Sequence, residues 1–107
     1  VLNIPLAAGG GGAAMRAAYD AQVWPALDAF APELVLVSAG FDAHSADPLG
    51  GLGWRTADFV WLTERLCDLA DAHAGGRVVS CLEGGYDLDA LAESVAAHVG
   101  VLMERGA

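Results

Sequence analysis

The chain has 107 residues, 55% of them hydrophobic, and a formal net charge of −9 from 14 acidic residues, five arginines and no lysine. This acidity repels the phosphate backbone of nucleic acid and favours the approach of cationic substrates, although it is also a common route to solubility. Because of this acidity we do not expect a nucleic-acid partner. No run of about 18 apolar residues occurs, so we do not expect a membrane span.

The beginning of the chain and its two cysteines bear on whether it is part of a longer protein and on its location in the cell. It does not begin with Met, and its first six residues read as a buried strand, so we expect a fragment or a truncated product. No basic stretch precedes a hydrophobic run, which disfavours a signal peptide. Cys67 and Cys81 lack CxxC spacing and are typical of reduced, buried thiols, so we expect a cytoplasmic protein.

Three continuous apolar runs of strand length alternate with three helical patterns. The runs cover residues 1–6, 34–38 and 77–82. Continuous rather than alternating hydrophobicity is typical of parallel strands that are covered on both faces. The sequence therefore predicts an α/β fold with a parallel sheet and helices on both faces, here as a three-strand βαβαβα segment.

The first helix is expected to begin after the four glycines at 9–12, to kink or break at Pro25 and to end at Pro32. A glycine-rich loop before a helix can bind phosphate, which makes nucleotide binding an alternative function. The fingerprint is incomplete, because no Gly-Lys-Ser/Thr follows and no basic residue precedes Arg16. Nucleotide binding is therefore the weakest of the functions considered.

The second helix is expected to begin near Thr56, a suitable N-cap, and to end before Gly75-Gly76. The third begins near Leu88 and carries an apolar stripe that we expect to pack on the core. The stripe consists of Leu88, Leu91, Ala92, Val95, Val99 and Leu102. His73 and His98 lie on these helices without a companion at ligand spacing, so we expect both to be structural.

Two loops follow the second and third strands, from Gly40 to Arg55 and from Glu83 to Asp87. Loops of about 15 residues in compact domains are usually functional or disordered. Both loops leave the carboxyl ends of parallel strands, where open α/β sheets bind their ligands. We therefore expect them to face one site.

The first of these loops concentrates groups that can bind a metal ion. Asp42, His44 and Asp47 place two carboxylates and an imidazole within six residues, and an Asp-x-His pair on an extended segment can direct both side chains to one side. Aspartate and histidine also form turns, and Asp47-Pro48 is a typical turn-initiating pair. The residues alone leave a metal site and a turn open.

The second loop presents Tyr86 directly after Gly84 and Gly85. The glycines permit positive φ and a close approach of substrate to the backbone. A tyrosine hydroxyl is protonated at neutral pH and can donate a hydrogen bond to a developing oxyanion. A tyrosine packed at a strand end accounts for the same residues. Glu83 and Asp87 flank the turn and could orient it through hydrogen bonds to backbone N–H groups, although solvated loop carboxylates are the ordinary case.

Three segments complete the sequence pattern: residues 32–44, residues 47–50 and residues 82–86. In this order they resemble the histone deacetylase family, most closely its class II and bacterial branch with acetoin-utilisation proteins and acetylpolyamine amidohydrolases. The likeness extends over essentially all 107 residues. It implies an arginase/deacetylase-type fold, hydrolysis of an acetyl amide at a single zinc ion, and a chain that forms the C-terminal part of one deacetylase domain over residues 1–107.

The same resemblance implies roles for individual residues. Asp42 matches an aspartate ligand of the zinc ion, and Tyr86 matches the tyrosine that stabilises the oxyanion. The positions that match the lining of the substrate tunnel are Leu49, Gly84 and Gly85. His44 matches no ligand, and the family's Asp-x-His ligands and paired histidines are expected before Val1. We therefore expect the isolated chain to be inactive.

Two functions of different classes follow. One is a zinc-dependent deacetylase that acts on acetylated lysine or polyamines, with this chain carrying part of the active site. The other is a non-catalytic truncated module that forms homo-oligomers or docks on another chain through its uncovered apolar strands.

Overall fold

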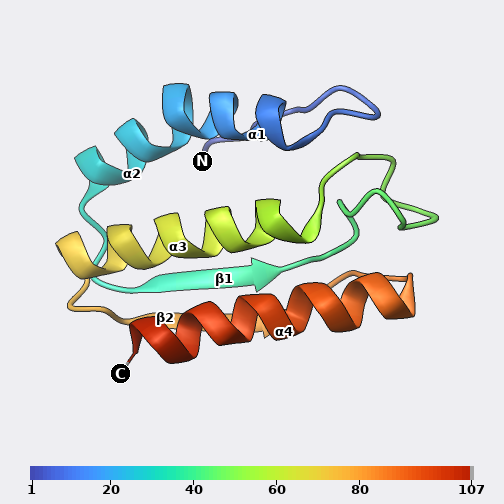
Figure 1. Ribbon diagram of the computed structural model, residues 1–107. Helices are drawn as coiled ribbons and strands as arrows, with labels where there is room; N and C mark the ends of the chain where they lie inside the picture. The colour runs from blue at the N-terminus through green and yellow to red at the C-terminus, as the bar shows by residue number, and fades with distance from the viewer. Residues whose placement is uncertain (107) are drawn as a thin grey trace.

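The computed structural model describes residues 1–106 as two strands with helices packed on them (Figure 1). In chain order the elements are α1 (Gly12–Ala18), η1 (Tyr19–Val23), α2 (Trp24–Phe30), β1 (Val35–Ala39), α3 (Thr56–His73), β2 (Val78–Leu82) and α4 (Leu88–Arg105). Within this range, no helix is long and apolar enough to cross a membrane.

β1 and β2 pair in parallel, with Val35 opposite Val78 and Val37 opposite Ser80. Paired residues point to the same face of a sheet, and so do alternate residues of one strand, so these four side chains share a face. On this face α3 covers Val35, and α4 reaches Ser80 through a hydrogen bond with His98. Both long helices therefore pack on the same side of the sheet.

No helix of residues 1–106 covers the other face of the sheet, which we call the bare face. Leu36 and Val79 lie opposite each other there, and they are 71% and 48% exposed. The predicted α/β class with a parallel sheet is confirmed. The sequence predicts helices on both faces of the sheet. In residues 1–106 the helices cover one face and leave the other open.

The expected strand over residues 1–6 does not form, so the predicted three strands are corrected to two. A strand exists through hydrogen bonds to a neighbour, and among the described residues the only ladder joins β1 to β2. Residues 1–4 instead lie beside the first helical segment, in a groove shared with Leu27 and Phe30. Their hydrophobicity predicts burial, but hydrophobicity cannot supply a pairing partner.

The first helical segment is interrupted where Pro25 predicts it. The π-helical turn η1 joins α1 to α2, and the N–H of Trp24 donates to the carbonyl of Tyr19. Pro25 has no N–H to donate and its ring crowds the preceding turn, so a wider turn relieves the clash. The segment ends at Ala31, whose φ of 52° is left-handed, and Pro32 follows.

The ends of α3 and α4 lie close to the predicted ones, but the cap of α3 is different. Arg55 occupies the N-cap position instead of Thr56, and the Asp58 carboxylate accepts its N–H at 2.8 Å. Gly75 and Gly76 follow the end of α3 with φ of 59° and 77°. α4 begins after Asp87, whose carboxylate accepts a backbone N–H in the first turn.

Two clusters of buried side chains pack against α3. The larger contains Met15, Ala39, Phe41, Trp54 and Phe59. The smaller contains Val35, Leu69, Ala70 and Ala74. Because Phe41 belongs to the larger cluster, the start of the long loop after β1 is anchored in the core.

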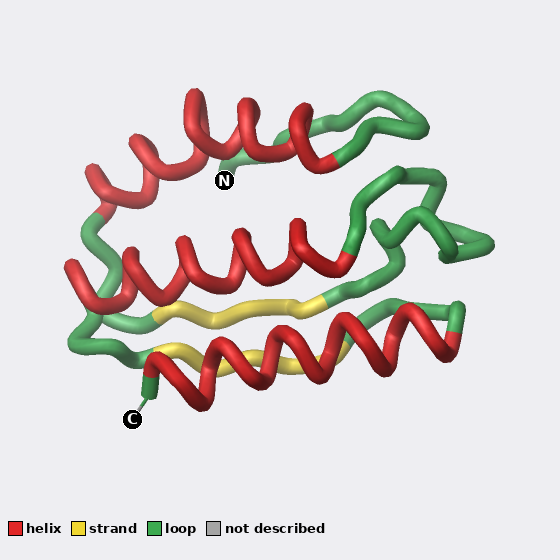
Figure 2. The backbone as a smooth tube through the Cα atoms, viewed as in Figure 1, coloured by secondary structure: helices red, strands yellow, loops and turns green. Residues whose placement is uncertain are grey.

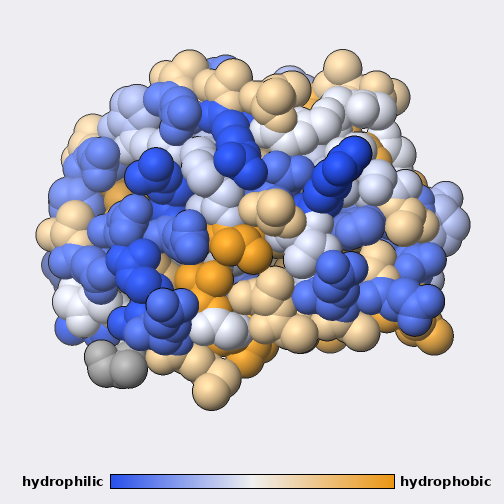
Figure 3. All heavy atoms as spheres, in the orientation of Figure 1, coloured by the Kyte–Doolittle hydropathy of each residue, from blue (hydrophilic) through white to orange (hydrophobic). Residues whose placement is uncertain are grey.

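The predicted apolar stripe of α4 is only partly buried. Leu91 and Val95 pack against the larger cluster, but Leu88 and Val99 are 79% and 42% exposed. The buried positions are instead Ala90, Ser94, His98 and Val101. Apolar side chains therefore remain on the surface, and Figure 3 shows an apolar area surrounded by hydrophilic side chains on one face of the molecule.

His98 is a buried polar residue that links three elements. Its Nδ1 lies 2.8 Å from the hydroxyl of Thr63 in α3, and its Nε2 lies 2.8 Å from the hydroxyl of Ser80 in β2. The Thr63 hydroxyl donates to the carbonyl of Phe59 at 2.6 Å, so it can only accept from His98. The neutral ring therefore carries its proton on Nδ1, and Nε2 accepts from Ser80.

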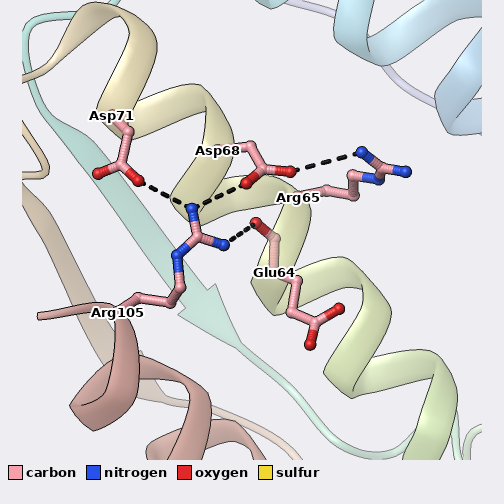
Figure 4. Close-up of polar contacts among 5 residues, drawn as sticks. All are labelled: Glu64, Arg65, Asp68, Asp71 and Arg105. Atoms are coloured by element: carbon pink, nitrogen blue, oxygen red, sulfur yellow. Dashed lines mark hydrogen bonds and ion pairs between the residues drawn. The ribbon is translucent and has the colours of Figure 1, made fainter.

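Arg105 fastens the last turn of α4 to α3 (Figure 4). One guanidinium nitrogen lies 2.8 Å from carboxylate oxygens of both Asp68 and Asp71, and another donates to the backbone carbonyl of Glu64 at 3.3 Å. The hydrogen bonds to Asp71 and Asp68 raise the pKa of Arg105 above its ordinary value. This network and His98 together fix α4 along α3.

The His98 network predicts a pH dependence of stability. Burial lowers the pKa of His98, so the folded chain binds this proton more weakly than the unfolded chain, where histidine titrates near about 6.5. Folding stability from this residue is therefore complete above about pH 6.5 and is lost as the pH falls below that value, by up to about 1.4 kcal/mol per pH unit.

Urea unfolding between about pH 5 and 8 measures this effect. The variant His98→Gln should have a flatter profile than the parent chain, whereas Gly100→Ala, which removes no titratable group, should keep the parent's slope. Equal slopes for the parent and His98→Gln would contradict the assignment.

Candidate active site

The loops that follow β1 and β2 meet at one end of the sheet (Figure 2). The N–H of Glu83 donates to the carbonyl of Ala39 at 2.9 Å, and the N–H of Phe41 donates to the carbonyl of Gly84 at 2.7 Å. These two bonds join the loops directly beyond the strand ends. The predicted meeting of the two loops is therefore confirmed.

Asp42 lies where the loops touch, next to two glycines. A Cβ atom placed on Gly84 would lie 2.5 Å from Asp42 Oδ2, and one placed on Gly40 would lie 3.1 Å from Oδ1. Only a residue without a side chain leaves room for the carboxylate at position 84. On the other side, Gly50 lets the backbone carbonyl of Asp42 approach closely.

Tyr86 and the predicted tunnel residues lie on the same two loops, and of these residues Gly84 lies against the Asp42 carboxylate. Tyr86 is 55% exposed and Leu49 is 71% exposed, so both side chains are accessible. Gly85 has a φ of 146°, and a Cβ atom there would lie 2.7 Å from Leu91 Cδ1. Gly84 therefore makes room for Asp42, and Gly85 allows the turn that leads to Tyr86 to pack on α4.

Asp47 joins the two loops through its side chain. Oδ1 accepts the N–H groups of Leu49 and Gly50 at 2.8 and 3.0 Å, and Oδ2 accepts the N–H of Tyr86 at 2.8 Å. Desolvation acts to raise the pKa of Asp47, but hydrogen bonds from Leu49, Tyr86 and Gly50 outweigh it and hold the pKa below its ordinary value. The sequence shows the turn at Asp47-Pro48 but gives no sign of the bond to Tyr86.

His44 takes part in a turn. Its Nδ1 accepts the N–H of Ala46 at 3.0 Å, which is the arrangement expected of a loop histidine that orders its own backbone. Among residues 1–106, no three His, Cys, Asp or Glu side chains lie together as a group that could hold a metal ion. The residues alone leave a metal site and a turn open for this loop. The contacts of His44 and Asp47 are those of a turn.

The remaining sequence candidates have structural partners. The glycines at 9–12 pack against the loop before α3, where Gly9 donates to Gly51 and Gly53 donates to Gly10. The Asp58 carboxylate lies against Gly12 and pairs with Arg16 at 3.1 Å, which places a negative charge where a phosphate would bind. The glycine loop is therefore poorly suited to nucleotide.

Two histidines and two cysteines lie apart from the loops. His73 pairs with Asp28 at 3.0 Å, and His98 is held inside the core, so both have the structural roles predicted for them. Cys67 is buried, as expected, but Cys81 is exposed on the bare face of the sheet. Neither cysteine takes part in the meeting of the two loops.

The chain is similar to known proteins over most of its length. Residues 1–102 match the family model described as the histone deacetylase domain. The chain is 50% identical over 95 residues to "Histone deacetylase 10, chloroplastic" of Oryza sativa subsp. japonica, covering 89% of this chain and 21% of that protein. It is 45% identical over 85 residues to "Histone deacetylase-like amidohydrolase" of Pseudomonas aeruginosa, covering 79% of this chain and 22% of that protein.

Solved structures show the same likeness in three dimensions. The HDA15 HD domain has a TM-score of 0.84 and 37% identity, with 92% of this chain and 26% of that chain covered. The histone deacetylase Clr3 has a TM-score of 0.86 and 35% identity, with 96% and 17% covered. The chain spans about a fifth of the length of the two curated relatives named above, at 21% and 22%. It belongs to the histone deacetylase family.

Proposed function

We propose that this chain supplies the oxyanion donor and one metal ligand of a zinc-dependent deacetylase, which removes acetyl groups from acetylated lysine or acetylated polyamines. One observation carries the proposal. The loops after β1 and β2 are bonded to each other so that the Asp42 carboxylate lies against Gly84, two residues before Tyr86. The net charge of −9 suits a cationic substrate.

The proposed zinc ion needs ligands that this chain does not supply. A catalytic zinc ion generally has three protein ligands, and the described residues offer Asp42 without a group of three. Residues 1–106 therefore do not fit a zinc site by themselves. In a complete enzyme, residues outside this chain would have to supply the other ligands and the groups that activate water.

Tyr86 has a role that its own hydroxyl can perform. When water adds to an acetyl carbonyl, the carbonyl oxygen gains negative charge, and a donor placed beside it stabilises the transition state more than the substrate. The exposed side chain of Tyr86 is available for this bond. Leu49, Gly84 and Gly85 would form the wall along which the acylated chain enters.

Replacing Tyr86 with Phe tests the donor. In the full-length enzyme that carries this chain, Tyr86→Phe should lower kcat by about 100-fold or more while KM changes little, because the bond forms mainly in the transition state. Hydrolysis of an acetyl-lysine peptide and of an acetylpolyamine gives both constants. A variant with the parent's kcat would remove Tyr86 from this role.

Replacing Gly84 with Ala tests the position of Asp42. The new Cβ would lie 2.5 Å from Oδ2, and the end of a carboxylate can rotate away, so the fold should survive while the carboxylate moves. In the full-length enzyme that carries this chain, we expect a loss of about 10- to 100-fold in zinc affinity and activity, measured by chelator competition and turnover. Gly100→Ala is the control, because a Cβ atom there meets no other atom within 4 Å.

The bare face of the sheet supports the second function, a non-catalytic module. Leu36 and Val79 are exposed side by side, and an uncovered apolar sheet face favours association. In this case the isolated 107-residue chain should have the mass of two or more chains in sedimentation equilibrium. Leu36→Glu should reduce that mass, and a purely monomeric parent chain would argue against the module.

A further inference from the structure

We propose that Asp47 is a positioning residue for Tyr86, which holds the tyrosine's backbone so that its hydroxyl is directed at the reacting carbonyl. The inference rests on the proposed function. Asp47 lies in the loop after β1 and Tyr86 in the turn after β2, 39 positions along the chain, yet Asp47 Oδ2 accepts the Tyr86 N–H at 2.8 Å. The contact therefore joins the metal-ligand loop to the donor loop.

The bonds of Asp47 distinguish this role from metal binding. Both of its carboxylate oxygens already accept backbone N–H groups, from Leu49 and Gly50 at Oδ1 and from Tyr86 at Oδ2. An anion surrounded by N–H donors is stabilised in its charged form, in keeping with its lowered pKa. The carboxylate is thus committed to ordering backbone.

Tyr86 needs such a restraint because its surroundings provide little. Gly84 and Gly85 precede it, and glycine gives the backbone more conformational freedom than any other residue. The residue is 55% exposed, so packing restrains it only in part. Among the described residues, the side chain that hydrogen-bonds to the Tyr86 amide is that of Asp47.

A carboxylate suits this place better than an amide. Its two oxygens accept from both loops at once, whereas asparagine would present an N–H₂ group to one of the backbone N–H donors. Oδ1 keeps the turn at Leu49 and Gly50, on the same loop as Asp42. Oδ2 carries the contact between loops and is the part that the proposal concerns.

The test uses Asp47→Ser in the full-length enzyme that carries this chain. Serine can still accept from the turn N–H groups but is too short to reach Tyr86, so it removes the contact between loops. We expect kcat to fall by about 10- to 100-fold with KM within about threefold, and the Tyr86 amide to exchange hydrogen faster. Asp89→Asn, an exposed carboxylate in the first turn of α4, is the control and should match the parent.

A double-mutant cycle with Tyr86→Phe separates positioning from general loss of structure. If Asp47 acts through the Tyr86 hydroxyl, Asp47→Ser should cost almost nothing in kcat once that hydroxyl is gone. Additive losses, or unchanged exchange of the Tyr86 amide in Asp47→Ser, would overturn the proposal. If Tyr86→Phe alone leaves kcat unchanged, the proposed function fails, while amide exchange still reports on the contact itself.

Discussion

The parallel pairing of β1 with β2 is the constraint on which the site depends. Parallel strands end at the same edge of a sheet, and here the loops beyond them are joined by the bonds of Glu83 to Ala39 and of Phe41 to Gly84. The positions of Asp42 and Tyr86 are therefore set by sheet geometry over several residues. A shift in register would change how the two loops lie relative to each other even if each kept its own conformation.

The buried hydrogen bonds of His98 in α4 also help to position the loop after β1. The His98 ring, held by Thr63 and Ser80, lies 5.5 Å from the ring of Phe41 in an edge-on contact. Phe41 immediately precedes Asp42 and packs in the larger core cluster. Because a buried polar group must keep its partners, this network specifies where α3, α4 and β2 meet, and through Phe41 it fixes the base of the site.

The sequence predicts those parts of the molecule that depend on local physics. Continuous hydrophobicity locates β1 and β2, Pro25 locates the interruption of the first helical segment, and Gly75-Gly76 locate the end of α3. The predicted strand at residues 1–6 is wrong, because a strand depends on a partner and hydrophobicity reports only a tendency to be buried. The apolar stripe of α4 indicates a packed helix, but its rotation depends on the fit of His98 between two other elements.

The site residues show the same division. Asp42 and Tyr86 could be placed at one edge because strand order implies it. Residue type alone cannot reveal whether a loop carboxylate binds a metal ion, caps a turn or holds a second loop. Asp47 and Asp42 differ in their neighbours. Three backbone N–H groups donate to the Asp47 carboxylate, whereas the Asp42 carboxylate lies against glycines, which have no side chains.

At this edge of the sheet the Asp42 carboxylate needs space, whereas the segment before Tyr86 needs a restrained backbone. Different residues meet these two requirements. Gly84 and Gly85 give space for the Asp42 carboxylate and for packing on Leu91, but they leave the segment before Tyr86 with few restraints of its own. A bulkier residue would restrict the backbone and displace the carboxylate. Restraint therefore has to come from outside the turn, and a charged acceptor with two oxygens supplies it from the neighbouring loop without occupying the space that a substrate would need.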